Sequence, residues 1–304
     1  MKIKIAKTAG FCWGVKRALD LVLKTAKESK EKVYTYGPLI HNEDVVDILT
    51  DRGIKTVDPA KITALPRKAI IIIRAHGIAP DTRKKLEGRG YRLIDATCPH
   101  VRVSQKKISG YAGPVSASPD GAAPEYQIII AGDKKHAEVI SLNGYAQAQI
   151  ISGQAKKGGL KPIVVSSARE AALLKIKKDQ PVCIVAQSTF QEEEYKKIIT
   201  ILKSKVTNLN VLNTICRSTT VRQREVVELS GQVEAMIVVG AHHSANTTRL
   251  AGLARSRGIP AFHVANVAEL PVEELKKYQV VGLTAGTSTP DWVIQPVIEK
   301  LKKL

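Results

Sequence analysis

Short apolar runs alternate with amphipathic stretches along the whole chain, and this alternation constrains the fold more than any other feature. Apolar runs of about four to seven residues bounded by turn residues are typical of buried strands, whereas the longer stretches between them have helical periodicity. Alternating strands and helices form parallel sheets with helices on their faces. We therefore expect an α/β fold with mainly parallel sheets. The clearest strands are predicted at residues 69–73, 126–130, 163–166, 182–186, 235–239 and 280–284.

The net charge of the chain is strongly positive, since 47 Lys and Arg against 28 Asp and Glu give +19. A basic surface attracts nucleic acids, anionic small molecules and acidic proteins alike. Aromatic residues make up only 4% of the chain, and no aromatic-rich RNA-binding signature is present. The chain therefore has few side chains on which nucleic-acid bases could stack. We therefore expect an anionic substrate or an acidic protein partner, and no nucleic acid.

No segment of the sequence indicates a membrane span or a secreted protein. No apolar run reaches the roughly 18 residues that cross a bilayer, and the chain opens with a strand-like segment rather than a signal or transit sequence. We expect a cytoplasmic protein of two or three domains, because the chain has 304 residues. Disulfides seldom persist in the cytosol, so its widely spaced cysteines are expected to bind a metal or take part in catalysis.

Three of the four cysteines occur at the same point of a repeated pattern. Cys12, Cys98 and Cys216 each end a strand or turn, and a helix with basic residues follows. A helix N-terminus and nearby cations favour the thiolate form of cysteine. Three thiolates could hold a zinc ion with a water molecule, or three irons of a cubane cluster whose fourth iron has no protein ligand. Cys183 lies inside an apolar strand, where we expect a buried core thiol.

A second repeat places histidines in turns that follow predicted strands. These turns contain His41, His76, His136 and the pair His242 and His243. In open α/β sheets, ligands bind outside the carboxyl ends of the strands, where these turns fall. Further candidate substrate-binding donors near predicted helix starts are Ser188, Thr189, Ser244, Asn246 and Ser288. Together these donors predict a pocket for a phosphate or diphosphate group.

Glu138 is the carboxylate closest to a histidine in these turns, two residues after His136. A carboxyl group beside a substrate pocket can donate a proton to the reacting molecule. The same residue could instead occupy the first turn of a helix only because negative charge is favoured there. Glu138 is therefore a candidate proton donor, with the helix-start role as the alternative.

Eight segments that carry these residues resemble the 4-hydroxy-3-methylbut-2-enyl diphosphate reductases, the last enzymes of the non-mevalonate isoprenoid pathway. In chain order the segments are AGFCWGVKRAL, GPLIHN, RAHGI, DATCP, HAEV, NTICRSTTVRQ, SANTTRL and TAGTSTPDW. The resemblance runs nearly from end to end. The sequence departs from the family pattern at Ala137, where Pro is usual, and at Ser188, where Thr is usual.

The resemblance implies a cofactor and a role for each site residue. Cys12, Cys98 and Cys216 match the three ligands of a 4Fe-4S cluster whose apical iron is open to the substrate. Glu138 matches the essential acid of the family, and Ser188 falls where a threonine hydroxyl usually bonds to that acid. The residues that match the diphosphate-binding groups are His41, His76, His136, Ser244, Asn246 and Ser288.

The resemblance also implies a fold, a reaction and partners. The fold is three α/β domains in a pseudo-threefold arrangement around the cluster, which we place at residues 1–98, 99–213 and 214–284, with 285–304 returning to the first domain. The reaction is reductive dehydroxylation of the substrate to isopentenyl and dimethylallyl diphosphates. Its electrons are expected to come from an acidic carrier such as ferredoxin or flavodoxin, because the chain is basic.

Two other functions use the same features of the sequence. A zinc-dependent hydrolase could employ the three cysteines as metal ligands, and a basic RNA-binding protein could keep them for structure.

The segment 110–124 is rich in Pro, Gly, Ala and Ser, and we expect a loop or a shortened helix end there without a chemical role.

Overall fold

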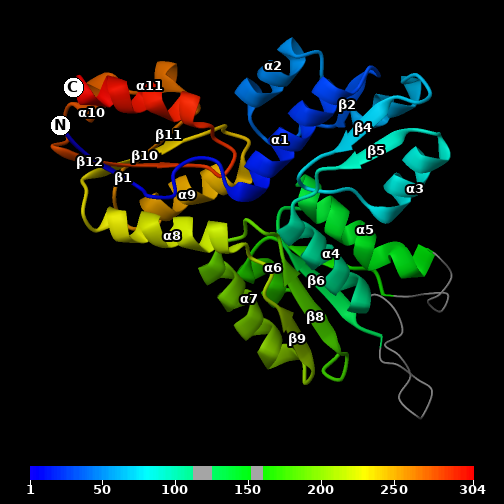
Figure 1. The fold of residues 1–304 in the computed structure, drawn as a ribbon. Helices are drawn as coiled ribbons and strands as arrows, with labels where there is room; N and C mark the ends of the chain where they lie inside the picture. The colour runs from blue at the N-terminus through cyan, green and yellow to red at the C-terminus, as the bar shows by residue number, and fades with distance from the viewer. Residues whose placement is uncertain (112–124, 152–159) are drawn as a thin grey trace. The chain divides into compact units, whose positions relative to one another are not determined.

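The computed structural model describes residues 1–111, 125–151 and 160–304, which form three sheets of four strands each with helices between them (Figure 1). Most of the loop-like segment 110–124 lies outside the described residues, and its first two residues end a helix. Among the helices of the described ranges, none is long and apolar enough to cross a membrane. The expected α/β fold with parallel sheets is confirmed.

One sheet has the strand order β1-β12-β10-β11. Its strands are β1 (Lys2–Ile5), β12 (Val280–Ala285), β10 (Ala235–Val239) and β11 (Ala261–Val264), and neighbouring strands are parallel. The helices in this part of the chain are α8 (Arg217–Ser230), α9 (Ala245–Ser256), the short η2 (Val267–Glu269), α10 (Val272–Leu275) and α11 (Asp291–Lys302). Figure 1 shows α11 on one face of this sheet and α8 with α9 on the other.

Alternate side chains of β10 explain why both faces of this sheet are covered. Ile237 packs into a core cluster with residues of α11, whereas Met236 and Val238 pack into a cluster with residues of α8 and α9. Successive side chains of a strand point to opposite faces, so an uninterrupted apolar strand needs helices on both sides. The apolar run at 235–239 therefore dictates a sheet that is buried on both faces.

A second sheet has the order β3-β2-β4-β5. Its strands are β3 (Lys55–Val57), β2 (Val33–Tyr36), β4 (Ile70–Ile73) and β5 (Arg92–Asp95). The helices in this part of the chain are α1 (Trp13–Glu28), α2 (Glu43–Asp51), the short η1 (Pro59–Ala64) and α3 (Pro80–Gly88). All four residues of β4 are fully buried isoleucines, which makes this strand the centre of the apolar core here.

The third sheet has the order β7-β6-β8-β9 and is parallel throughout. Its strands are β7 (Ile163–Val165), β6 (Gln127–Ala131), β8 (Val182–Ala186) and β9 (Leu209–Leu212). The helices are α4 (Pro99–Tyr111), α5 (Ala137–Ile151), α6 (Ala168–Ala172) and α7 (Glu192–Lys205). Residues of α4 and α5 share one core cluster with the sheet, and residues of α7 share another on the opposite face.

The described residues divide into two compact units. One unit consists of residues Met1–Lys30, Thr35–Pro59 and Cys216–Leu304, and the other of Glu31–Tyr34 and Ala60–Ile215. The last strand of the chain, β12, pairs with the first strand, β1, within the first of these units. The division into four segments at residues 98, 213 and 284 stays a prediction.

Candidate functional site

Each of the three sheets carries its predicted site residues at equivalent positions. In each sheet an edge strand leads to a cysteine: β1 to Cys12, β5 to Cys98 and β9 to Cys216. The strand beside each edge strand leads to a polar turn, with Ser288 after β12, His76 after β4 and Ser188 after β8. The next strand leads to a second polar turn, with Ser244 after β10, His41 after β2 and His136 after β6. The two repeats in the sequence therefore follow one repeated sheet topology.

The three cysteines occupy the same position relative to their helices. The carbonyl oxygens of Cys12, Cys98 and Cys216 each accept a hydrogen bond of 3.0 Å from the backbone N–H four residues later. Cys12 and Cys216 are the N-caps of α1 and α8, and Cys98 directly precedes α4. Each half-buried thiol thus stands at a helix N-terminus. The predicted placement of these thiols is confirmed.

Hydrogen bonds tie each cysteine loop to the turn of the neighbouring strand. The Cys12 N–H donates to the Thr287 carbonyl at 3.1 Å, and the Cys98 N–H donates to the Ala75 carbonyl at 2.9 Å. Before Cys216, the Thr214 hydroxyl accepts from the Ala186 N–H at 2.8 Å and donates to its carbonyl at 2.7 Å. These bonds fix each cysteine next to a turn that carries a predicted substrate-binding residue.

Cys183 has a different environment from the other three thiols. It is fully buried in β8, and burial raises the pKa of its thiol to about 12. A thiol that stays protonated at neutral pH is a poor metal ligand, since the thiolate is the binding form. The expected buried core thiol is confirmed.

Asp95, which was not among the residues predicted from the sequence, positions the Cys98 loop. One of its carboxylate oxygens accepts a hydrogen bond from the Thr97 N–H at 2.9 Å, and the other lies 3.3 Å from an Arg102 nitrogen and also contacts Arg83. Burial alone would raise the pKa of Asp95, but the hydrogen bonds from Thr97 and the charge of Arg83 lower it below the usual value. An ionised Asp95 therefore holds the segment that leads to Cys98.

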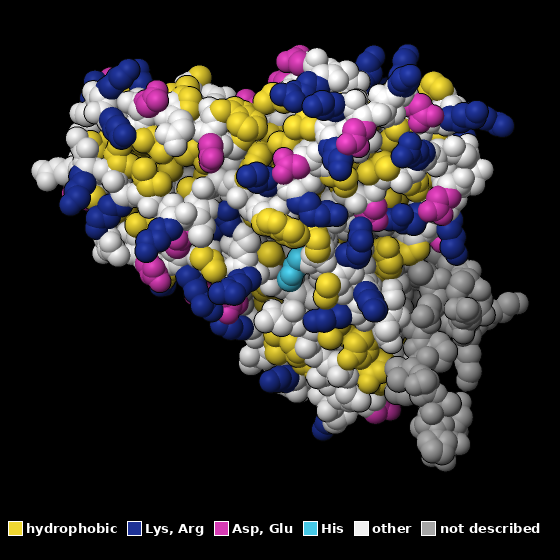
Figure 2. All heavy atoms as spheres, in the orientation of Figure 1, with side chains coloured by type: hydrophobic (Ala, Val, Ile, Leu, Met, Phe, Trp, Pro, Cys, Tyr) yellow, Lys and Arg dark blue, Asp and Glu magenta, His cyan; other side chains and the backbone are white. Residues whose placement is uncertain are grey.

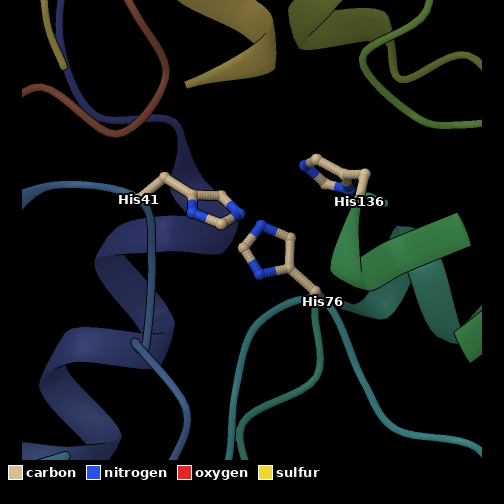
Figure 3. Close-up of side chains that lie close together, drawn as sticks. All are labelled: His41, His76 and His136. Carbon is tan, nitrogen blue, oxygen red and sulfur yellow. The ribbon is translucent and has the colours of Figure 1, made fainter. Parts of the chain in front are cut away.

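His76 and His136 lie in one unit, and their rings pack edge to face with centroids 5.0 Å apart. Figure 3 shows that His76 comes from the loop after β4 and His136 from the start of α5. The Glu138 N–H donates to His136 Nδ1 at 3.2 Å, so neutral His136 carries its proton on Nε2 and presents that group as a donor. Gly77 adopts a φ of +73° immediately after His76, a conformation that favours glycine.

Glu138 lies in the first turn of α5 and is only 1% exposed. One carboxylate oxygen accepts a hydrogen bond from the Ser188 N–H at 2.7 Å, and the other accepts from the Ser188 hydroxyl at 2.6 Å. A buried carboxyl with both oxygens oriented by one neighbour has a defined geometry, which a helix-start carboxylate in solvent lacks. A hydroxyl can also accept, so Ser188 can remain bonded to Glu138 in either protonation state.

Gln187 connects the turns that carry Glu138 and Ser188. Its side-chain oxygen accepts from the Asp133 N–H at 3.1 Å, and its amide nitrogen donates to the Thr189 hydroxyl at 3.0 Å. The residue is fully buried. Gln187 was not among the predicted site residues, because its only signal in the sequence is a polar residue directly after the apolar strand β8.

The start of α9 supplies backbone and side-chain donors. Ser244 is its N-cap, and the Ser244 hydroxyl oxygen accepts from the Thr247 N–H at 3.4 Å and from the Thr247 hydroxyl at 3.0 Å, so its own O–H is left to donate. Asn246 is 3% exposed, and its Nδ2 is buried without a hydrogen-bond partner among the described residues. A buried helix N-terminus with an unused amide donor is suited to an anionic group.

The turn after β12 packs closely against the start of α9. The backbone of Gly286 lies so close to Thr247 that an added Cβ would come within 2.1 Å of its hydroxyl oxygen, so this position requires glycine. The Ser288 hydroxyl donates to the backbone carbonyl of His41 at 3.3 Å. Ser244, Ser288 and His41 therefore belong to the same unit.

The fourth histidine turn is arranged differently. His242 Nε2 lies 2.7 Å from a carboxylate oxygen of Glu269, and both side chains are about half exposed. The His243 ring packs edge to face with the ring of His41, at a centroid separation of 5.9 Å. His242 thus contacts a carboxylate at the surface, whereas His243 is the member of the pair that contacts a predicted substrate-binding residue.

The thiols and donors fit the groups that the sequence implied. Three soft thiols at helix N-termini are the ligand type that iron–sulfur clusters and zinc prefer. Two buried N–H groups without partners among the described residues, Asn246 Nδ2 and Arg222 Nε, are suited to anionic groups such as a diphosphate or a cluster. The residue types present are therefore those that a metal centre and an anionic substrate require.

Comparisons with known proteins agree with these features. The family model described as LytB protein matches residues 3–302. A 4-hydroxy-3-methylbut-2-enyl diphosphate reductase from Treponema denticola is 38% identical over 310 residues, which cover 99% of either chain. The solved structure of the E-1-hydroxy-2-methyl-but-2-enyl-4-diphosphate reductase from Plasmodium falciparum matches with a TM-score of 0.87 and 26% identity, over 99% of this chain and 88% of that one. A second solved structure, described as the terminal enzyme of the non-mevalonate pathway, matches over all of both chains with a TM-score of 0.66 and 34% identity.

Proposed function

Because the chain belongs to the LytB family, we propose that it reduces (E)-4-hydroxy-3-methylbut-2-enyl diphosphate to isopentenyl diphosphate and dimethylallyl diphosphate, the last step of the non-mevalonate pathway. The observation that carries the proposal is the repeated placement of Cys12, Cys98 and Cys216 at helix N-termini beside polar turns. The reaction consumes two electrons and two protons for each substrate. The allylic C–O bond breaks, its oxygen leaves as water, and a new C–H bond forms on the allylic carbons.

Cys12, Cys98 and Cys216 are the residues that we propose as ligands of a 4Fe-4S cluster. Three cysteine ligands leave one iron without a protein ligand, and when bound the cluster supplies electrons and a Lewis-acid position for the substrate oxygen. The chain contributes the soft ligands and the helix N-termini that favour their thiolate forms. Cys183 is excluded from this set by its burial in β8.

We propose that the diphosphate is bound by donors from the polar turns. Asn246, Ser244 and Ser288 contribute from the turns after β10 and β12, and the N-terminus of α9 adds its backbone N–H groups. The remaining donors that we assign to the diphosphate are His41, His76, His136 and Thr189. A diphosphate carries several negative charges, and hydrogen bonds to an ionised acceptor are shorter and stronger than those between neutral groups.

Glu138 is the proposed proton donor. Its carboxyl is buried, and Ser188 holds both of its oxygens at 2.6 to 2.7 Å. A carboxyl held in this way can deliver a proton to a fixed point of the substrate, which is the geometric requirement for general acid catalysis. The Ser188 hydroxyl takes the role that a threonine usually has in this family.

The electrons must come from a separate one-electron carrier. We propose an acidic protein such as ferredoxin or flavodoxin, since the chain carries a net charge of +19 and opposite potentials speed encounter. Figure 2 shows Lys and Arg side chains over the whole visible face, interspersed with Asp and Glu. We place the protein in the cytoplasm, where thiols stay reduced. Electron-transfer rates that do not fall as salt is raised would contradict this choice of carrier.

Anaerobic purification followed by iron, sulfide and zinc analysis tests the proposal. We expect a brown protein with about four irons and four sulfides per chain, which converts the substrate to the two diphosphate products when a reductant is supplied. A colourless protein that contains zinc would support the hydrolase instead. A metal-free protein that binds RNA in a salt-sensitive way would support the nucleic-acid alternative.

A further inference from the structure

Arg222 is a buried cation that the proposed reaction does not use. It lies on α8, six residues after Cys216, and is 4% exposed. Its Nη2 donates to the carbonyl of Gly10 at 2.7 Å, and its Nη1 donates to the carbonyl of Ser218 at 3.1 Å and also contacts the Ser218 hydroxyl. Gly10 precedes Cys12 by two residues, and Ser218 follows Cys216 by two residues. One guanidinium thus connects the loops of two proposed cluster ligands.

A second residue of α8 holds the same loop. The Glu225 carboxylate accepts from the backbone N–H of Thr8 at 3.1 Å and also contacts the Thr8 hydroxyl. Glu225 follows Arg222 by three residues, so the two side chains project from one face of α8. Two side chains of α8, Glu225 and Arg222, therefore hold the loop that precedes Cys12. This is the helix that starts directly after Cys216.

The charge of Arg222 interacts electrostatically with both thiols. Burial lowers the pKa of Arg222, and the charges of Cys12, Glu225 and Cys216 oppose that shift, so these groups are within electrostatic range of the guanidinium. An arginine remains protonated in proteins. Its Nε is buried without a hydrogen-bond partner among the described residues, so one N–H donor is left unused.

We propose that Arg222 is a positioning residue that sets both the geometry and the reduction potential of the metal centre. The inference rests on the proposed function, because it takes Cys12 and Cys216 as cluster ligands. The guanidinium fixes the spacing of the two ligand loops, and its charge and unused N–H stabilise the more negative, reduced form of the cluster. Net charge and hydrogen bonds to sulfur are the features by which proteins tune such potentials.

The experiment is a redox titration of the anaerobically reconstituted full-length protein, followed by electron paramagnetic resonance. Arg222→Gln removes the buried charge, and we expect the ratio of reduced to oxidised cluster at the wild-type midpoint to fall roughly tenfold, or about 59 mV for one electron. Glu225→Gln removes the opposing charge and should move the midpoint in the opposite direction. Arg222→Lys keeps the charge and should stay closer to wild type than Arg222→Gln does.

The matched control is Arg224→Gln, which removes the same charge from an exposed position on the same helix. Solvent screens an exposed charge, so its midpoint should equal that of the wild type. Equal midpoints for Arg222→Gln and Arg224→Gln, in proteins that both hold a cluster, would overturn the inference and leave the proposed function intact. If Arg222→Gln fails to hold a cluster, an unmoved midpoint in Glu225→Gln overturns it. A wild-type protein without any cluster would overturn the proposed function itself.

Discussion

The turn after β6 and the turn after β10 occupy the same position in their sheets but differ in how their polar side chains are hydrogen-bonded. The turn after β6 leads to Glu138, and both oxygens of this carboxyl are bonded to Ser188 on the neighbouring turn. The turn after β10 leads to Asn246, whose buried Nδ2 has no partner among the described residues. One turn thus fixes a titratable group through internal hydrogen bonds, and the other leaves a donor for a ligand.

We infer from this difference that equivalent turns of the repeated sheets have different functions. A residue that transfers a proton must be held at one point, so its hydrogen-bonding capacity is satisfied within the protein. A residue that binds an anion must keep its donor for the ligand. We therefore propose that Glu138, after β6, transfers the proton, and that Asn246, after β10, binds the anion.

Substitutions of the cysteine that recurs in all three sheets should have the largest effect on activity. Replacing Cys12, Cys98 or Cys216 by Ser is expected to abolish activity and to degrade or remove the cluster, because a hard hydroxyl is a poor substitute for a soft thiolate. The measurement is iron and sulfide content per chain together with activity. Cys183→Ser is the control, and it should keep its iron and most of its activity. Equal iron loss in all four variants would contradict the choice of ligands.

In the turn after β6, Glu138→Gln tests the proton donor. The variant keeps the size of the side chain but cannot supply a proton, so we expect kcat to fall by roughly 10²–10⁴-fold while KM changes little. Steady-state kinetics with saturating reductant measure this. Ser188→Thr restores the residue usual in the family and should leave kcat near the wild-type value. A wild-type rate for Glu138→Gln would make this carboxylate a structural feature of α5.

In the turn after β10, Asn246→Ala tests the binding donor. Loss of one hydrogen bond to a charged group costs about 1.5–3 kcal/mol, so we expect KM to rise roughly 10- to 100-fold, with a smaller change in kcat. The matched control is Thr248→Ala on the same turn of α9, because Thr248 is exposed and its hydroxyl already donates to the His242 carbonyl at 3.0 Å. This control should leave KM unchanged. A normal KM with a greatly lowered kcat for Asn246→Ala would assign chemistry to this turn as well.

Strands with an uninterrupted apolar run could be predicted from the sequence, both the inner strands and the edge strand β7. All six predicted strands are present, and they include the two middle strands of the third sheet, β6 and β8. The strands β3, β5, β9 and β11 were not predicted. Each of them lies at the edge of its sheet and is only partly buried, so its sequence lacks the apolar run that marks a central strand. The inner strand β2 was also missed, because Thr35 interrupts its short apolar sequence.

The parts of the site that could be predicted are those marked by residue type and by a repeated pattern in the sequence. The thiols and the histidine turns recur along the chain, which is visible in the sequence, and the family match confirms the resemblance. Asp95, Gln187 and Arg222 could not be found in this way, because they act through contacts with other segments of the chain. Arg222 in particular reads as one more basic residue of a solvated helix until its contact with Gly10 is known.

The smallest expected effect concerns the thiol that lies outside the repeats. Cys183 has its pKa raised to about 12 by burial, whereas an unfolded cysteine ionises near pH 8.5. The stabilising contribution of the protonated thiol is therefore complete below about pH 8.5 and is lost progressively as the pH rises toward 12. We expect the free energy of unfolding of the wild type to fall by about 2 kcal/mol relative to Cys183→Ala between pH 8 and pH 10. Parallel pH profiles from denaturant titrations would contradict the burial of this thiol.

Substrate binding to the oxidised, cluster-loaded protein tests the division between the two turns most directly, because no turnover occurs without electrons. Calorimetric titration of the substrate should give a Kd for Glu138→Gln within about twofold of the wild type, and a Kd for Asn246→Ala that is roughly 10- to 100-fold weaker. Normal binding by Asn246→Ala, or an equally large loss of binding in Glu138→Gln, would contradict the division.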